Sequence, residues 1–317
     1  MQCRLQRSSL KWDYWKEQSN MAIFKGAGVA IITPFTATGI DWDRFRTLLN
    51  WHVEQGTNAI VVCGTTGEAS TMSETEKKEA IKFTVEVIAG RIPVIAGTGT
   101  NNTSASIAMS KYAESVGADA LLIINPYYNK TSSEGLYRHF KAINDEVNIP
   151  IVVYNVPSRT GMNISAENLE RLATLGNVKA VKEASGDIAQ IARIRRLLPE
   201  EFQIFSGNDD QVVPIMALGG DGVISVTGNL IPKAISDMTK AFLEGDVKEA
   251  LRLQMATFDI TSAMFIETNP IPLKAAMKLE GLDSGILRLP LWEITEPNLM
   301  KVEAAMKAFG LLGGQNG

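Results

Sequence analysis

The sequence predicts an α/β fold, a (β/α)8 TIM barrel followed by a C-terminal helical subdomain. Eight short apolar segments recur from residue 28 onward at intervals of roughly 25 to 35 residues. Amphipathic helical stretches separate them. The glycine fingerprint that an open doubly wound sheet usually carries after its first strand is absent, so this alternative architecture is disfavoured.

The apolar segments are short and are bounded by glycine, proline or polar residues, as buried parallel strands are. We expect strands at residues 28–35, 59–64, 93–99, 120–126, 150–155, 178–185, 202–208 and 222–228.

Between these strands, apolar residues recur with helical spacing. We expect helices at residues 43–55, 74–89, 104–116, 133–146 and 166–175. Ser73 and Glu76 have the spacing of a capping box, which predicts that the second of these helices begins directly after Ser73.

Three parts of the chain follow from this pattern. Residues 1–20 are polar and lack the apolar core of a secretory signal, so we expect a disordered or non-native extension outside the fold. Residues 21–244 are expected to form the catalytic barrel. Residues 245–317 continue with helical stretches and no intervening strand, which predicts the C-terminal helical subdomain.

Composition narrows the class of function. The 317 residues are 45% hydrophobic and 21% charged, with a net charge of −4, which gives no general attraction to nucleic acid or anionic membranes. No apolar run reaches the roughly 18 residues that span a bilayer, and the expected location is the cytoplasm. Cys3, Cys63, His52 and His139 show no disulfide or metal-ligand spacing, so no metal centre is expected. No organic cofactor is expected either.

Lys182 is the most informative residue, because it lies inside the apolar strand segment 178–185. Burying an ammonium costs several kcal/mol unless it is paired or loses its proton. A lysine with a pKa of about 10.4 is neutral about once in a thousand near pH 7.4, and a neutral lysine is a nucleophile. A snorkelling or ion-paired lysine is the alternative, but strand alternation places the adjacent Glu183 on the opposite face.

Chemistry in such barrels gathers where the strands end, and these ends are polar here. Thr65 and Thr66 lie in a glycine-flanked loop expected just ahead of a helix, a place that suits a carboxylate, although a simple turn is equally compatible. Tyr154 ends the strand next to Lys182 and is either a proton shuttle or a core tyrosine. Arg159 can grip a carboxylate with two bonds, although loop arginines are usually only solvated.

Several motifs together resemble the dihydrodipicolinate synthase (4-hydroxy-tetrahydrodipicolinate synthase) family, within the pyruvate-dependent Schiff-base aldolases and lyases. The resemblance spans roughly residues 24–312. The motifs that carry it are Gly64-Thr65-Thr66-Gly67-Glu68, Tyr154-Asn155-Val156-Pro157-Ser158-Arg159-Thr160-Gly161, Lys182-Glu183-Ala184-Ser185, Gly222-Val223-Ile224-Ser225-Val226 and Asn269-Pro270-Ile271-Pro272.

The resemblance implies a role for each candidate residue. Lys182 would form an imine with pyruvate, and Tyr154 would transfer protons, linked through the Thr66 hydroxyl to Tyr128 of an adjacent subunit. It also implies that Thr65 and Thr66 bind pyruvate, that the Ile224 carbonyl faces the substrate, and that Gly207 leaves room for it.

The same resemblance implies the substrates. The run that contains Arg159 favours L-aspartate 4-semialdehyde as the second substrate, and a step toward diaminopimelate and lysine. The assembly would be a homodimer or a dimer-of-dimers tetramer. Two alternatives remain open: another pyruvate aldolase, such as an N-acetylneuraminate lyase or a sugar-acid aldolase, and a non-catalytic barrel that binds a keto acid.

One departure from the family pattern concerns feedback by lysine. Many bacterial members have a lysine site with a histidine pair and a glutamate, and the matching positions here are Glu74, Lys77 and Ala105, although Asn101 and Tyr127 are kept. The glutamate that would pair with the ammonium of lysine is missing, and Lys77 adds a like charge. We therefore expect weak or absent inhibition, and inhibition at sub-millimolar lysine would contradict this.

Overall fold

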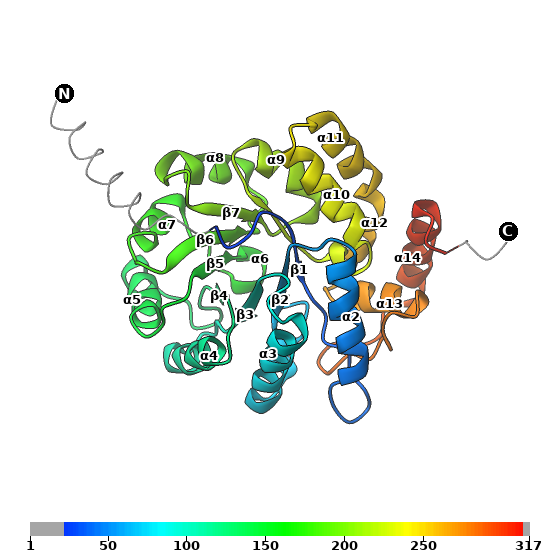
Figure 1. Ribbon diagram of the computed structural model, residues 1–317, viewed down its shortest axis with the longest axis horizontal. Helices are drawn as coiled ribbons and strands as arrows, with labels where there is room; N and C mark the ends of the chain where they lie inside the picture. The colour runs from blue at the N-terminus through cyan, green and yellow to red at the C-terminus, as the bar shows by residue number, and fades with distance from the viewer. Residues whose placement is uncertain (1–21, 313–317) are drawn as a thin grey trace.

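The computed structural model describes residues 22–312, which form a closed barrel of eight parallel strands (Figure 1). Each strand pairs with the next in sequence, and β1 pairs with β8 to close the ring. The strands are β1 (Gly26–Ala30), β2 (Ala59–Val62), β3 (Val94–Gly97), β4 (Ala120–Ile124), β5 (Ile151–Asn155), β6 (Val178–Glu183), β7 (Gln203–Ser206) and β8 (Gly222–Ser225). The predicted (β/α)8 barrel is confirmed, whereas the expectation for residues 1–20 lies outside the described residues.

Helices surround the barrel as the sequence pattern predicts (Figure 1). They are α2 (Trp42–Glu54), α3 (Glu74–Ile88), α4 (Thr103–Ser115), α5 (Ser133–Asn144), α6 (Pro157–Thr160), α7 (Ala166–Leu172), α8 (Ile188–Leu197), α9 (Val212–Ala217) and α10 (Pro232–Leu243). The capping box at the start of α3 is confirmed, since the Ser73 side chain accepts from the Glu76 N–H and the Glu76 carboxylate accepts from the Ser73 N–H.

Most strands end earlier than their apolar segments suggest. β1 was expected over residues 28–35 but ends at Ala30, and β4 was expected to 126 but ends at Ile124. The reason is that backbone groups beyond these points bond outside the sheet: the Ile32 N–H, for example, donates to the Asn229 side chain at 2.9 Å. The residues after each strand therefore form the loops of the barrel mouth.

The barrel interior is apolar below this mouth. Alternate residues of the strands, such as Val152, Ala180 and Ile224, meet inside the ring. Phe24, which precedes β1, stacks on Phe205 with ring centroids 4.2 Å apart. A larger apolar core lies between the outer face of the sheet and the helices. The two cores leave the strand C-terminal ends as the place where polar side chains can converge.

Up to residue 312, where the described part of the chain ends, four helices follow α10, and Figure 1 shows the last two beside the barrel. They are α11 (Val247–Ala256), α12 (Phe258–Met264), α13 (Ile271–Leu279) and α14 (Glu296–Phe309). The predicted boundary between residues 244 and 245 falls just after α10 and stays a prediction.

A buried ion pair joins α13 to the loop after β2. Lys274 and Glu68 have fully buried side chains, and their Nζ and Oε1 atoms lie 2.7 Å apart. Lys274 Nζ also donates to the carbonyls of Thr33 and Ile286, at 2.9 and 2.8 Å. Glu68 Oε2 accepts from the backbone N–H of Arg288 at 3.0 Å. Both charges are therefore satisfied by polar partners rather than by water, and the pair fixes the loop that carries Thr65 and Thr66.

We predict that Lys274→Met lowers the free energy of unfolding by about 3–5 kcal/mol, because the Glu68 charge is left buried without its partner. Urea denaturation would measure the loss. The double variant Glu68→Gln/Lys274→Met removes both charges and should recover part of it. A loss below about 1 kcal/mol in the single variant would contradict the role given to this pair.

Candidate active site

A cavity of about 180 Å³ lies at the mouth of the barrel, where β2, β5, β6 and β7 end. Every candidate residue except Tyr128 and Ile224 lines it. Those that do are Thr65, Thr66, Tyr154, Arg159, Lys182 and Gly207, joined by Asn269 from the segment between α12 and α13.

Lys182 reaches this cavity from the inner face of β6. Its strand register pairs it with Tyr154 of β5, and its Nζ lies 4.5 Å from the centroid of the Tyr154 ring. Within residues 22–312, no carboxylate oxygen lies within 4 Å of this nitrogen. Burial is the main cause that lowers the pKa of Lys182 to about 8; the charge of Asp209 opposes this shift and the charge of Arg159 adds to it. A useful share of the amine is therefore neutral near pH 7.

Glu183 does not neutralise Lys182, because it lies on the other face of β6. Its carboxylate accepts from the Asn155 side chain at 3.0 and 3.1 Å, from Gln190 at 3.1 Å and from the Ser185 N–H at 2.8 Å. Burial raises the pKa of Glu183, and the hydrogen bonds from these donors only partly oppose that shift. Glu183 therefore belongs to a separate polar network on the outer face of β6 and does not form an ion pair with Lys182.

Tyr154 is buried beside Lys182, and burial raises the pKa of its phenol. Arg159 and a hydrogen bond with the Thr65 side chain oppose that shift. The sequence-based expectation linked Tyr154 through Thr66 instead. In the structure the side-chain hydrogen bond of Tyr154 is with Thr65, while the Thr66 hydroxyl accepts from the Asn269 side chain. Two adjacent threonines cannot be ranked from sequence alone, since the turn decides which hydroxyl faces the tyrosine.

The loop that holds both threonines turns sharply after β2. Cys63 and Glu68 have left-handed backbones, with φ of 57° and 55°. The N–H groups of Thr65 and Thr66 donate no hydrogen bond to the described part of the chain, which leaves them available to an anion. The expected helix does not follow directly: a 3-10 turn at Ala69–Thr71 intervenes before α3, so a helix dipole is a smaller contribution than expected.

Arg159 lies in the one-turn helix α6 and lines the same cavity. Its Nη2 donates to the backbone carbonyl of Asn269 at 3.1 Å. The sequence places Asn269 in a family motif but predicts no role for it. Its position depends on packing of the C-terminal helices against the barrel, which no local pattern indicates.

Two further candidates behave differently. Ile224 is buried in the inner apolar cluster of the barrel and does not line the cavity through its side chain. Gly207 lines it closely: a Cβ added there would lie 2.6 Å from Ala184 Cβ and 3.2 Å from Lys182 Cε. Glycine at this position therefore leaves room for the Lys182 side chain itself.

Tyr128 lines neither the cavity that contains Lys182 nor the one beside it. Its side chain is 91% exposed, and its backbone has a left-handed φ of 65°. A side chain with so much exposed surface is free to contact another molecule.

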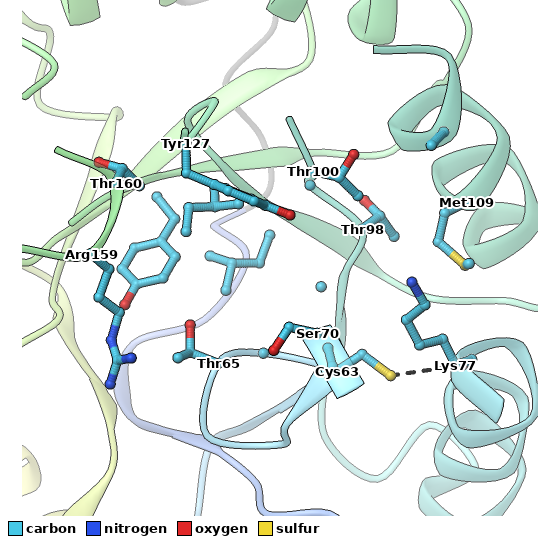
Figure 2. Close-up of a pocket in the computed structure, with 18 of the residues that line it drawn as sticks. Cys63, Thr65, Ser70, Lys77, Thr98, Thr100, Met109, Tyr127, Arg159 and Thr160 are labelled. Carbon is cyan, nitrogen blue, oxygen red and sulfur yellow. Dashed lines mark hydrogen bonds between the residues drawn. The ribbon is translucent and has the colours of Figure 1, made fainter. Parts of the chain in front are cut away.

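A second cavity of about 390 Å³ adjoins the first and is shown in Figure 2. Arg159 and Lys77 lie on opposite sides of this view, with Thr65 between them and Tyr127 above. Glu74 and Ala105, two of the positions in the departure from the lysine site, also line it. The expectation of weak lysine inhibition stays a prediction.

His52, His139 and Cys63 are buried, whereas Cys3 lies outside the described residues. His52 Nδ1 contacts the Thr57 hydroxyl at 3.1 Å, and burial lowers its pKa to about 3. His139 Nδ1 contacts the Thr103 hydroxyl at 2.9 Å. Burial raises the pKa of the Cys63 thiol to about 12. Among residues 22–312, no three His, Cys, Asp or Glu side chains are grouped to hold a metal, and no helix there is long and apolar enough to span a membrane.

Comparisons with known proteins identify the family of the chain. The profile of the Dihydrodipicolinate synthetase family matches residues 23–309. The chain is 55% identical over 292 residues to 4-hydroxy-tetrahydrodipicolinate synthase 1 of Clostridium acetobutylicum, covering 92% of this chain and 100% of that protein. It is 56% identical over 290 residues to the synthase of Clostridium perfringens SM101, covering 92% and 100%.

A solved structure points the same way. Dihydrodipicolinate synthase from Aquifex aeolicus superimposes with a TM-score of 0.89 at 42% identity, covering 91% of this chain and 99% of that one. The enzyme class and fold expected from the sequence are confirmed. The chain belongs to the Dihydrodipicolinate synthetase family.

Proposed function

We propose that the protein condenses pyruvate with L-aspartate 4-semialdehyde to give 4-hydroxy-tetrahydrodipicolinate, with Lys182 as the Schiff-base residue. One observation carries this proposal above the others. Lys182 is a buried lysine at the mouth of the barrel with a pKa lowered to about 8 and, within residues 22–312, no carboxylate within 4 Å. Curated relatives with more than half of their residues identical are named for this reaction.

In the proposed mechanism, the neutral Lys182 amine attacks the keto carbon of pyruvate. The resulting carbinolamine loses water to form an imine, and loss of a methyl proton gives the enamine. The enamine carbon then attacks the aldehyde carbon of the second substrate. Finally, the amine of that substrate replaces Lys182 at the imine carbon, which closes the ring and frees the enzyme.

Proton transfers in these steps are assigned to Tyr154. Its ring lies against the Lys182 nitrogen, and its hydroxyl bonds with Thr65, so it can pass a proton between the reacting atoms and the loop. We therefore assign the link in the relay to Thr65 rather than to Thr66. The free N–H groups of Thr65 and Thr66, together with the Thr66 hydroxyl, are proposed to hold the pyruvate carboxylate. The Ile224 carbonyl is retained as a lesser candidate for contact with substrate.

Arg159 is proposed to select the second substrate. Its guanidinium lines the cavity that contains Lys182 and can bind the carboxylate of L-aspartate 4-semialdehyde with two bonds. The alternative of another pyruvate aldolase, acting on a sugar-acid aldehyde or N-acetylmannosamine, gives no comparable role to the Arg159 guanidinium. A keto-acid-binding barrel without catalysis would have no need for Tyr154 beside a neutral lysine.

Turnover with a panel of aldehydes tests this assignment. We expect pyruvate consumption to prefer L-aspartate 4-semialdehyde strongly over sugar aldehydes and N-acetylmannosamine. Arg159→Ala should lower kcat/KM for the semialdehyde about 10- to 100-fold, because a charge-assisted hydrogen bond is lost. The exposed Arg193→Ala serves as a matched control. Preference for another aldehyde would indicate another pyruvate aldolase. No turnover with any of the aldehydes would favour the non-catalytic barrel that binds a keto acid.

The pH dependence tests the state of Lys182. Because only the neutral amine attacks pyruvate, the rate of imine formation should rise about tenfold per pH unit up to about pH 8 and level off above it. Stopped-flow measurement of imine formation from pH 6 to 9 gives the profile. A rise that continues through pH 9 would show that Lys182 has an ordinary lysine pKa and would contradict the proposed activation.

We also propose that the protein acts in the cytoplasm as a homodimer, or as a tetramer made of two dimers, in which Tyr128 enters the partner's site. The 91% exposure of Tyr128 in the single chain supports a shared site. In a twofold dimer each site would then combine Lys182 of one subunit with Tyr128 of the other.

Hybrid dimers test the shared site. A dimer of one Tyr128→Phe chain and one Lys182→Ala chain keeps one complete site, so it should regain about half of wild-type activity. Co-expression with two affinity tags and activity assays of the purified hybrid provide the measurement. Activity no higher than that of either variant alone would count against the sharing of Tyr128.

A further inference from the structure

We propose that Asn269 is a positioning residue that fixes the direction of the Thr66 hydroxyl, so that Thr66 donates its proton to the carboxylate of pyruvate. This inference rests on the proposed function, because it assigns pyruvate to the cavity that Thr66 and Lys182 line.

The direction follows from the chemistry of the two groups. Asn269 Nδ2 lies 2.9 Å from Thr66 Oγ1, and both side chains are buried. An amide nitrogen only donates, so the hydroxyl oxygen must accept this bond. A hydroxyl that accepts keeps its own single proton for another acceptor. The described residues offer the Thr66 hydroxyl no such acceptor, and the open space beside it is the cavity that contains Lys182.

Asn269 also contacts Arg159, which lines the same cavity, but through its backbone. Its carbonyl accepts from Arg159 Nη2 at 3.1 Å. The Asn269 side chain therefore bonds to Thr66, which is proposed to hold pyruvate. Its backbone carbonyl bonds to Arg159, which is proposed to hold the aldehyde substrate. A side-chain substitution keeps the carbonyl, so its effect should fall on pyruvate and spare the semialdehyde.

Neighbouring contacts hold this arrangement in place. Asn269 lies two residues before the start of α13, which carries Lys274, and Lys274 pairs with Glu68 in the same loop as Thr66. Asn269 Oδ1 is buried and accepts no hydrogen bond within the described part of the chain. The contact with Thr66 is therefore the one hydrogen bond that those residues offer the Asn269 amide group.

Asn269→Asp reverses the direction of this bond while nearly preserving its shape. The carboxylate can only accept, so the Thr66 proton would turn toward it and away from pyruvate. We expect KM for pyruvate, and the pyruvate concentration that half-saturates borohydride trapping, to rise at least tenfold. KM for the semialdehyde should stay within about twofold. The neutral Asn269→Leu removes the bond without reversing it and should raise KM for pyruvate by a smaller factor.

Two controls separate the effect of the hydrogen-bond direction from the effect of an added charge, and a third check covers folding. Asn208→Asp adds a carboxylate to the same cavity without touching Thr66, and it should raise KM for pyruvate much less than Asn269→Asp. In a Thr66→Val background, Asn269→Asp should add no more loss than Asn208→Asp adds, because the hydroxyl it redirects is gone. Circular dichroism and thermal melting check each variant for folding.

Three results would overturn the inference while wild-type turnover persists. They are a KM for pyruvate within twofold of wild type in Asn269→Asp, an equal rise in both KM values, or the same rise in Asn208→Asp. Absence of turnover by the wild-type protein would instead overturn the proposed function and, with it, this inference.

Discussion

The burial of the Lys182 amine is the constraint on which the rest of the site depends. A second buried lysine, Lys274, shows how the surroundings decide its use. Lys274 is held by the Glu68 carboxylate and two backbone carbonyls, which favour its ammonium form even though burial lowers the pKa. Lys182 instead lies against the Tyr154 ring. In the described part of the chain, no carboxylate lies within 4 Å of its amine. Lys274 stabilises the fold, and Lys182 is suited to attack a carbonyl.

The barrel and the C-terminal helices divide the work of building the site. Strand register aligns Lys182 with Tyr154, and apolar packing below them fills the ring. The helices after α10 then reach back to the mouth through α13, whose Lys274 holds the loop after β2. The segment just before α13 supplies Asn269, which contacts both Thr66 and Arg159. Thus the part of the chain that follows the eighth strand completes a cavity that the barrel opens.

The sequence predicted the eight strands well because buried parallel strands are nearly continuous apolar runs. It placed the C-terminal ends of most strands too late in the chain. Ile31 and Ile32, for example, are as apolar as strand residues although they follow the end of β1. Lys182 was recognisable because an amine inside a strand is conspicuous. Lys274 was not, because lysine is common in helices, and its burial depends on tertiary packing. For the same reason the choice between Thr65 and Thr66, and the contact of Asn269, needed the structure.

Covalent trapping tests the central claim most directly. The protein would be incubated with pyruvate and sodium borohydride, and the modified residue would be located by peptide mass spectrometry, with borohydride alone as the control. The account predicts one pyruvate-derived adduct per chain, on Lys182, and none in Lys182→Ala, while Lys274 stays unmodified. Absence of an adduct in the wild-type protein, or an adduct on Lys274 or another lysine, would contradict it.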